Sequence, residues 1–343
     1  MDPKRELTSV DLAALVTELN RYEGAKVDKV YLYGDDLLRF KMRDFDRGRV
    51  ELLVEVGAAG VNPVDTYFRD GSYEPVGLPF TPGVDVAGTV AETGPGVDSF
   101  SVGDRVYGTG IGNGEYQGAY AEYATVPTER VVGLPDDAGT TQAGAAGVVA
   151  CTAWRALVDH ANLDPAEYCL VHGGSGGVGH VAVQMAAAVN ARCLSTAAPA
   201  YHDDVEALGA GTVLDYDRED LAEAVVDASD GGVDVILDHR LDDYLQFDAD
   251  VAAAEATVVG IGENDPAPAF SAVAGGRAKD VTYQLMSMFN TPDLRVPLRG
   301  VAHLMDAGAL EVEVARRYDL EEAAEAHRDV MNDSFFGKLV VEP

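Results

Sequence analysis

A glycine-rich turn constrains the fold of this chain more than any other feature of its sequence. Residues 172–180 read His-Gly-Gly-Ser-Gly-Gly-Val-Gly-His, which contains the spacing Gly174-x-Gly176-x-x-Gly179. An apolar run precedes the turn and a helical pattern over 178–189 follows it, so the turn joins a buried strand to a helix. Glycine at these positions allows a tight turn, close approach of the backbone to a phosphate and close packing of the helix on the strand. The sequence therefore predicts a dinucleotide-binding site.

The predicted ligand contacts lie in this turn and at the start of the helix after it. The first N–H groups of a helix lack partners within the helix, and they face an anion with the positive end of the helix dipole. Because these groups would hold a diphosphate, the expected cofactor-binding residues here are Gly174, Ser175, Gly176, Gly177, Val178 and Gly179.

The end of the next predicted strand selects between NAD and NADP. An Asp or Glu there would bind the 2′-hydroxyl of the NAD ribose. The run 195–199 reads Ser-Thr-Ala-Ala-Pro and contains no acid, which leaves room for a 2′-phosphate and favours NADP, as NADPH. Thr196, His202 and Tyr216 are the candidate neighbours of the cofactor here. No Lys or Arg follows the strand directly, so NAD stays an alternative.

The chain changes character near residue 141. From there on, strands alternate with helices, which implies a parallel, doubly wound sheet with right-handed crossovers. Asp280–Phe289 is expected to be a late strand of that sheet. Before residue 141 the strands are short and separated by Gly and Pro, a pattern that predicts an antiparallel, partly barrel-like domain.

The charge of the chain limits its partners. Its 343 residues include 58 acidic and 25 basic ones, for a formal net charge of −33. Such a charge repels phosphate backbones and disfavours nucleic acid as a partner. Dispersed acids with few lysines are the surface expected of a protein in concentrated salt, where screening removes the repulsion.

No run of 18 apolar residues is present, which argues against a membrane span. The first six residues lack the apolar core of a signal peptide, so a cytoplasmic location is expected. The three cysteines, Cys151, Cys169 and Cys193, have no zinc-ligand spacing, and their odd number argues against a disulfide scaffold. They are interpreted as small buried apolar residues.

The first 57 residues differ from the rest of the chain. They hold 10 basic and 12 acidic residues, whereas the remainder holds 15 and 46. A helix is expected before Gly24, and strands are expected over Lys26–Tyr33, Leu37–Arg43 and Arg49–Val56. The run from residue 4 to residue 29 resembles the opening of the NFACT-type N-terminal domain of ribosome quality-control factors. The three strands are expected to supply the first strands of the domain that follows.

From about residue 50 onward, the motifs taken in order resemble the medium-chain dehydrogenase/reductase superfamily, in its zinc-free quinone oxidoreductase (zeta-crystallin-like) branch. The matching runs are Gly60–Tyr67, Pro82–Gly88, Val102–Val106, Thr152–Leu157, the glycine-rich turn and Phe336–Val340. The resemblance implies an α/β fold, with a Rossmann-type doubly wound parallel sheet inserted into a GroES-like, mostly antiparallel β catalytic domain. The implied division is 1–142 for the first catalytic part (with the atypical segment 1–57), 143–284 for the NADP-binding domain and 285–343 for the return to the catalytic domain.

The resemblance also implies an active site without metal. Zinc-dependent relatives place Cys, His and Cys at positions that correspond to Asn62, Val84 and Val148 of this chain. Valine offers no metal ligand, so no metal is expected. Hydrogen bonds must then polarise the substrate oxygen, while the nicotinamide carries the hydride chemistry.

By resemblance, Asn62, Asp65 and Tyr67 line the active site. Asn62 would offer an amide donor, Asp65 would orient the loop or a ribose, and Tyr67 would polarise or protonate the substrate. Relatives also contact the cofactor at positions that match Thr152, Ile261 and Gly262. One departure from the family is the run 238–242, Asp-His-Arg-Leu-Asp, where relatives have a small glycine-containing turn near the nicotinamide ribose.

Two functions follow from these features. The first is a zinc-independent, NADPH-dependent reductase of quinones or α,β-unsaturated carbonyls (enones), an enzyme that forms a homodimer through its nucleotide-domain sheet at Val281–Phe289. The alternative is a non-catalytic nucleotide-binding factor whose N-terminal segment associates with the ribosome or tRNA.

Overall fold

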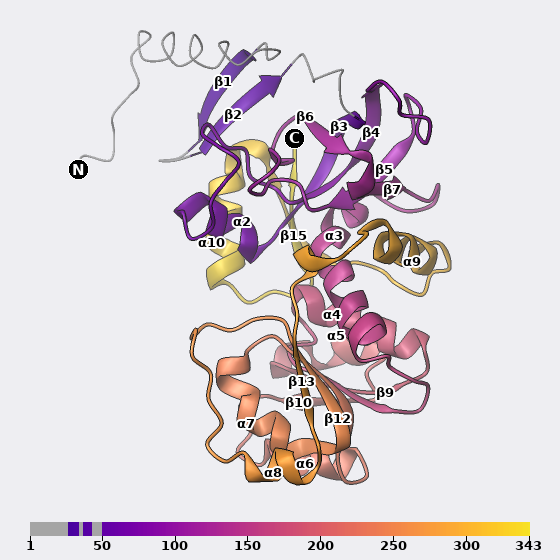
Figure 1. Cartoon of the computed structure of the whole chain (residues 1–343), viewed down its shortest axis with the longest axis vertical. Helices are drawn as coiled ribbons and strands as arrows, with labels where there is room; N and C mark the ends of the chain where they lie inside the picture. The colour runs from indigo at the N-terminus through magenta and orange to yellow at the C-terminus, as the bar shows by residue number, and fades with distance from the viewer. Residues whose placement is uncertain (1–26, 34–36, 43–49) are drawn as a thin grey trace, which may run out of the picture.

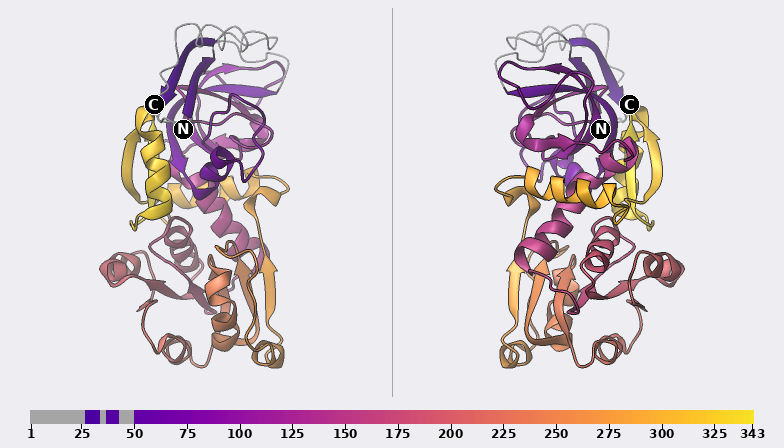
Figure 2. Two further views of the ribbon diagram at one scale, coloured as in Figure 1. Left: turned by 90° about the vertical axis from the view of Figure 1, so that its left-hand side faces the viewer. Right: turned by 90° about the vertical axis from the view of Figure 1, so that its right-hand side faces the viewer.

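The computed structural model describes residues 27–33, 37–42 and 50–343, which form two lobes stacked along the long axis of the molecule (Figure 1). Each lobe is built on one sheet. Helices α3 (Thr140–Trp154) and α9 (Arg295–Asp306) run between the lobes, as the two opposite side views of Figure 2 show. A π-helical turn, Arg155–His160, extends α3 toward the lower lobe.

The upper sheet is mixed and brings the last strand of the chain, β15, beside β3. Its order is β14-β15-β3-β4-β5-β7, with β6 paired to β3, and only the β14–β15 pair among these is parallel. The strands are β3 (Glu51–Val61), β4 (Asp85–Thr93), β5 (Arg105–Thr109), β6 (Tyr123–Pro127), β7 (Val131–Gly133), β14 (Val314–Asp319) and β15 (Lys338–Glu342). Helices α2 (Pro63–Asp70) and α10 (Ala323–Asn332) pack against each other at its side.

Local sequence explains how this sheet closes on itself. Leu52, Val54 and Val56 alternate along β3 and point into one apolar core. Gly88 in β4 faces the backbone of β3, where a Cβ atom would lie 2.0 Å from the carbonyl oxygen of Glu55. Glycine is therefore required at this close approach, and the register shifts beside it bend the pair of strands.

The lower sheet is parallel throughout, with the order β10-β9-β8-β11-β12-β13. Its strands are β8 (Tyr168–Val171), β9 (Arg192–Ala197), β10 (Thr212–Asp215), β11 (Val233–Asp238), β12 (Ala252–Gly260) and β13 (Thr282–Leu285). The chain between them includes helices α4 (Gly177–Ala188), α5 (His202–Ala207), α6 (Leu221–Ala228), α7 (Leu241–Val251) and α8 (Ala274–Ala278). The strand order reverses direction beside β8, which is where ligands bind in sheets of this kind.

The predicted α/β fold, with an antiparallel-rich sheet and a parallel Rossmann-type sheet, is confirmed. Two details differ, and one is not tested. Strands β1 (Val27–Tyr33) and β2 (Leu37–Met42) pair only with each other, so of the three early strands only β3 joins the upper sheet. The strand expected over Asp280–Phe289 is limited to β13, because a 3₁₀ turn follows at Met288–Asn290. The helix expected before Gly24 lies outside the described residues.

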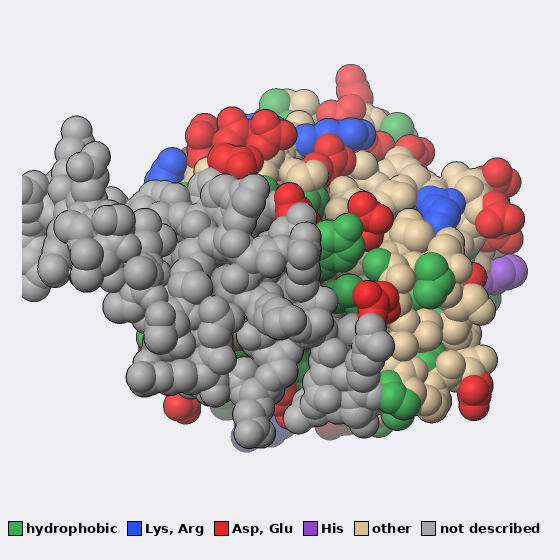
Figure 3. All heavy atoms as spheres, turned by 90° about the horizontal axis from the view of Figure 1, so that it is seen from above, with side chains coloured by type: hydrophobic (Ala, Val, Ile, Leu, Met, Phe, Trp, Pro, Cys, Tyr) green, Lys and Arg blue, Asp and Glu red, His purple; other side chains and the backbone are tan. Residues whose placement is uncertain are grey.

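Acidic side chains cover the surface of the described chain. On the face seen in Figure 3, more Asp and Glu than Lys and Arg side chains are visible among the coloured atoms. Among the described residues, none of the helices is both long enough and apolar enough to span a bilayer.

Candidate cofactor and catalytic site

The glycine-rich turn, residues 172–180, is called the phosphate turn below. It adopts a phosphate-binding geometry at the switch point of the parallel sheet. It leaves the end of β8 at a left-handed glycine, Gly173 (φ +68°), and enters α4 after Gly176. The N–H of Gly173 donates to Oγ1 of Thr196 at 3.0 Å, and the N–H of Gly174 donates to the carbonyl oxygen of Thr196 at 2.8 Å. These bonds fix the turn to the end of β9, and they leave the first N–H groups of α4 directed outward.

The glycines in this turn leave no room for side chains. A Cβ atom at Gly174 would lie 2.1 Å from Oγ of Ser195, and one at Gly179 would lie 2.1 Å from the carbonyl oxygen of Gly173. Gly176 and Ser175 are partly exposed beside them. The resulting bare backbone at a helix N-terminus fits a diphosphate, because N–H groups and helix dipole both favour negative charge there.

Three predicted residues lie beside the adenosine end of this turn. Thr196 is buried, and its hydroxyl oxygen accepts a hydrogen bond from the Gly173 N–H. His202 begins α5, where one ring nitrogen lies 3.1 Å from the carbonyl oxygen of Ala197. Tyr216 follows β10 and is 42% exposed. His202 and Tyr216 thus follow the carboxyl ends of adjacent strands, where a 2′-phosphate would be met.

Two loops continue the site on the other side of β8. Ile261 and Gly262 follow β12, and they are tied to the end of β11 because the Ile261 N–H donates to the carbonyl oxygen of Asp238 at 2.8 Å. His239, beside them, places its ring over the phosphate turn, where a Cβ at Gly173 would lie 2.7 Å from Cε1 of the imidazole. The candidate list from sequence omitted His239, although the missing glycine turn at 238–242 was the signal for it. Thr152 is buried in α3.

The catalytic candidates lie where β3 passes into α2. Asn62 precedes the helix and Pro63 opens it. Asp65 accepts hydrogen bonds from the N–H groups of Asn62 at 2.8 Å and of Val84 at 2.9 Å, and from the Tyr120 hydroxyl at 3.3 Å. The Asp65 carboxylate therefore holds the loop and the start of α2 in place.

The side-chain amide of Asn62 is fully engaged. Its Oδ1 accepts from Nζ of Lys338 at 2.7 Å, and its Nδ2 donates to Oδ2 of Asp85 at 2.8 Å. Oδ1 of Asp85 in turn accepts from the N–H of Val148 in α3 at 2.7 Å. The second N–H of Nδ2 donates to the carbonyl oxygen of Gly60 at 3.4 Å, so donation from this amide to a substrate oxygen would require one of the two Nδ2 bonds to open. Lys338 was absent from the predicted site, because no local pattern marks a lysine that pairs with a residue so far away in sequence.

Burial shapes the electrostatics of this network. It raises the pKa of Asp65 to about 7 and that of Asp85 to about 6, and it lowers the pKa of Lys338, whereas the nearby opposite charges oppose each of these shifts. N–H and O–H donors surround both carboxylates, so their hydrogen bonds favour the ionised forms. The loop is thus held by a buried arrangement of two acids and one ammonium group.

Tyr67 belongs to α2. It is half-buried, and its ring meets that of Tyr73 edge-on at a centroid distance of 5.6 Å. Burial raises the pKa of its hydroxyl, and so do Tyr73 and the carboxylates of Asp70 and Glu263. Because Glu263 directly follows Gly262, this interaction places the phenol near the loop after β12. Within the described residues, no hydrogen bond occupies the Tyr67 hydroxyl, so it can donate to a ligand.

The three positions that correspond to zinc ligands in relatives converge on this network. Asn62 is part of it, Val84 donates its N–H to Asp65, and Val148 donates its N–H to Asp85. In the described part of the chain, no group of three or more His, Cys, Asp or Glu side chains is arranged to hold a metal ion. All three cysteines are buried and free, as predicted.

Two histidines flank the phosphate turn and are buried. His180 lies against the turn, with Nδ1 3.0 Å from the carbonyl oxygen of Gly176, and it accepts from the N–H of Glu313 at 3.2 Å. His172 pairs with Asp248 at 2.9 Å and stacks on Tyr244. Burial lowers the pKa of His172 to about 4.

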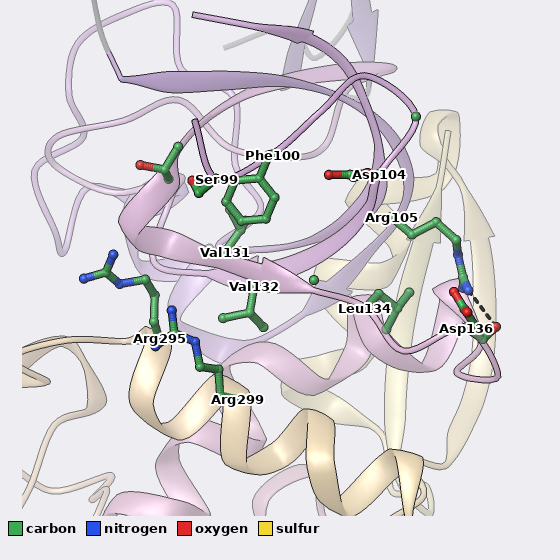
Figure 4. Close-up of a pocket in the computed structure, with 13 residues that line it drawn as sticks. Ser99, Phe100, Asp104, Arg105, Val131, Val132, Leu134, Asp136, Arg295 and Arg299 are labelled. Atoms are coloured by element: carbon green, nitrogen blue, oxygen red, sulfur yellow. Dashed lines mark hydrogen bonds between the residues drawn. The ribbon is translucent and has the colours of Figure 1, made fainter. Parts of the chain in front are cut away.

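A separate cavity of about 610 Å³ lies between the upper sheet and α9 (Figure 4). Phe100, Val131 and Val132 supply apolar lining, and Arg295 and Arg299 enter from α9. None of its lining residues belongs to the phosphate turn, α2 or the lower sheet, so this cavity is distinct from the candidate site.

Comparison with known proteins supports the assignment made from fold and site. The domain family described as "Alcohol dehydrogenase GroES-like domain" matches residues 48–136, and the family described as "Zinc-binding dehydrogenase" matches residues 208–341. The chain belongs to the medium-chain dehydrogenase/reductase superfamily and is an oxidoreductase.

Its relatives within that superfamily include quinone oxidoreductases. The quinone oxidoreductase of Lama guanicoe is 34% identical over 299 residues, which cover 85% of this chain and 88% of the relative. An alcohol dehydrogenase superfamily protein from Novosphingobium aromaticivorans superposes with a TM-score of 0.80 at 30% identity, over 89% of this chain and 96% of that one. The Escherichia coli quinone oxidoreductase complexed with NADPH superposes with a TM-score of 0.78 at 26% identity, over 93% of this chain and 100% of that one. The alternative of a ribosome- or tRNA-associated factor finds no support in these comparisons.

Proposed function

We propose that this protein is a zinc-independent, NADPH-dependent reductase of quinones or α,β-unsaturated carbonyls. The observation that carries the proposal is the glycine-rich turn from Gly173 to Gly179 at the N-terminus of α4, which lies at the switch point of the parallel sheet and in which Gly174 and Gly179 have no room for a Cβ atom. The relatives named quinone oxidoreductase, one of which was solved with NADPH, support the same reading.

The residues of this chain suit such a reduction. NADPH, when bound, supplies a hydride from C4 of the nicotinamide to the conjugated acceptor. The Tyr67 hydroxyl donates a hydrogen bond to the acceptor oxygen and then the proton that balances the hydride. Its raised pKa keeps the phenol protonated through neutral pH. Asn62 and Asp65 hold the start of α2, the helix that carries Tyr67.

NADPH is the proposed cofactor, because the end of β9 carries no acid that would bind a ribose 2′-hydroxyl. The proposed contacts with the 2′-phosphate are His202 and Tyr216. Zinc independence is proposed because Val84 and Val148 offer no ligand and the Asn62 amide is occupied by Lys338 and Asp85.

The proposed assembly is a homodimer through the lower sheet. Strand β13 is the last strand of that sheet, and Leu285 at its end is 68% exposed. A strand edge of this kind presents unpaired backbone groups that a second copy can satisfy. Sedimentation velocity of the wild type, compared with Leu285→Asp, tests this: the variant should sediment as a smaller species.

Steady-state oxidation of NADPH and NADH, with a series of quinones and enones, tests the proposed activity. We expect turnover with NADPH and at least one neutral quinone, and weaker turnover with NADH. Tight NADPH binding without turnover of any acceptor would overturn the proposed reaction while leaving the cofactor site in place.

A further inference from the structure

Lys338 is an exceptional residue in its strand. It opens β15, whose next residues are the buried Leu339, Val340 and Val341, and it is itself only 3% exposed. A buried ammonium group is costly unless it is hydrogen-bonded. Here Nζ donates to the carbonyl oxygen of Val61 at 2.5 Å and to Oδ1 of Asn62 at 2.7 Å.

Lys338 dictates which way the Asn62 amide faces. The ammonium group can only donate, so it selects the amide oxygen, and the Asp85 carboxylate can only accept, so it selects the amide nitrogen. Gly60 and Gly147 make room for that carboxylate, because a Cβ at either position would lie within 2.6 Å or 2.3 Å of one of its oxygens. The amide is therefore fixed between two opposite charges.

The same residue also contacts the phosphate turn. A Cβ at Gly177, the first residue of α4, would lie 3.0 Å from Cδ of Lys338, so the lysine stem packs against the start of the helix. The N–H of Gly337 donates to the carbonyl oxygen of Ser175 at 2.9 Å. One short segment of chain thus joins the loop before α2 to the turn that would hold the diphosphate.

We propose that Lys338 is a positioning residue for hydride transfer, which sets the Asn62 loop, and with it Tyr67, at a fixed place relative to the phosphate turn. This inference rests on the proposed function. Hydride transfer requires donor and acceptor atoms at near-contact distance, and a displacement of about 1 Å costs on the order of 100-fold in rate. A residue that ties the acceptor side to the cofactor side therefore controls the rate without touching the reacting atoms.

The test compares Lys338→Met with Lys279→Met. Nζ of Lys279 donates to backbone carbonyls of Ala249 and Asp250, away from the site, which makes it a matched control. Single-turnover hydride transfer should slow about 10- to 100-fold in Lys338→Met, and the isotope effect with C4-deuterated NADPH should rise. The Kd for NADPH should change less than about threefold, because the hydrogen bonds that tie Gly173 and Gly174 to Thr196 do not involve Lys338. Lys279→Met should match the wild type.

A double variant separates positioning from simple destabilisation. If Lys338 acts through Asn62, the variant Lys338→Met/Asn62→Ala should be as slow as the slower single variant rather than show the product of the two effects. Should Lys338→Met fail to fold, Lys338→Met/Asp85→Asn removes the unbalanced buried charge and takes its place. A wild-type hydride rate and isotope effect in either variant, with only the melting temperature lowered, would overturn the proposal.

Hydrogen exchange tests the proposed role of Lys338 independently of whether the protein is a reductase. Backbone exchange of residues 62–70 and 173–178 should accelerate in Lys338→Met and not in Lys279→Met, whether or not an acceptor is turned over. Unchanged exchange would overturn the proposed link. Absence of wild-type turnover would instead overturn the reductase proposal.

Discussion

The carbonyl oxygen of Gly173 lies 2.1 Å from the point that a Cβ atom would occupy at Gly179. No side chain fits there without displacing the phosphate turn, since real Cβ contacts are far longer. We therefore expect Gly179→Ala to weaken NADPH binding at least about tenfold, because the N–H groups of the turn lose their alignment. Titration of NADPH fluorescence measures the change.

Gly133→Ala is the matched control for this substitution. Gly133 ends β7, and a Cβ there would meet nothing within 4 Å. Its NADPH affinity should equal that of the wild type. Equal affinity in Gly179→Ala as well would show that the diphosphate binds elsewhere.

Removal of the Tyr67 hydroxyl should separate chemistry from cofactor binding. In Tyr67→Phe we expect kcat/KM for the acceptor to fall about 10- to 100-fold, because the proton donor is lost while the ring still packs on Tyr73. The Kd for NADPH should stay unchanged. Tyr73→Phe retains the Tyr67 hydroxyl and should keep most of the activity. A Tyr67→Phe enzyme with wild-type kcat/KM would remove Tyr67 from the mechanism.

The carboxylates near Tyr67 should select against anionic acceptors. Asp70 and Glu263 lie near the phenol, while Arg240 pairs with Asp242 and Asp243. We expect a neutral naphthoquinone to be reduced faster than its sulfonate, and Glu263→Gln to narrow that ratio by about 3- to 10-fold at low ionic strength.

Salt provides an internal check on this selectivity. At about 1 M salt the Debye length falls to about 3 Å, so the difference between wild type and Glu263→Gln should largely disappear. Glu255→Gln changes a carboxylate near the other end of β12 and should leave the ratio unaltered. A ratio that is insensitive to Glu263 would mean that shape, rather than charge, selects the acceptor.

The acids buried beside His172 should make the folded protein less stable as the pH rises. Burial raises the pKa of Asp238 to about 7 and that of Asp248 to about 8, far above the value of about 3.9 for an unfolded aspartate. These two acids therefore bind more protons in the folded state than in the unfolded state between about pH 4 and pH 8, and their contribution to the free energy of unfolding falls across that range.

Thermal unfolding from pH 6.5 to pH 8.5 measures this effect. His172 is neutral in the folded state throughout that window, because burial lowers its pKa to about 4. We expect the melting temperature of the wild type to fall by about 2–5 °C more than that of Asp238→Asn, which removes one of the two coupled acids. Parallel curves for the two proteins would contradict the assignment of raised pKa values to this pair.

The parts of the fold that could be predicted from sequence are those that local pattern specifies. The phosphate turn is nine consecutive residues between an apolar strand and a helix, so its geometry follows from glycine placement alone. Helix α7 was not expected, because its sequence Leu-Asp-Asp-Tyr-Leu-Gln-Phe-Asp-Ala-Asp-Val is rich in acids and shows little apolar periodicity. Helix α2 was not expected either, since it is short and its entry depends on bonds made to Asp65.

The network around Asn62 shows why the remaining contacts of the site could not be predicted from the sequence. Lys338 and Asn62 are 276 residues apart in sequence, and Asp85 belongs to another strand. Their partnership depends on β15 pairing with β3, a tertiary contact that no periodicity reports. The residue types at 62, 65 and 67 could be interpreted through family resemblance, whereas the engagement of the Asn62 amide required coordinates.

The order of the upper sheet has a consequence for biosynthesis. Strand β15 lies between β14 and β3, while all six strands of the lower sheet are encoded between β3 and β15. During translation the nucleotide-binding lobe can therefore complete its pairing while β3 still lacks one of its neighbours. The edge of β3 that pairs with β15 stays unpaired until β15, which carries Lys338, has been synthesised. In a nascent chain the lower sheet can therefore form before the network around Asn62 is complete.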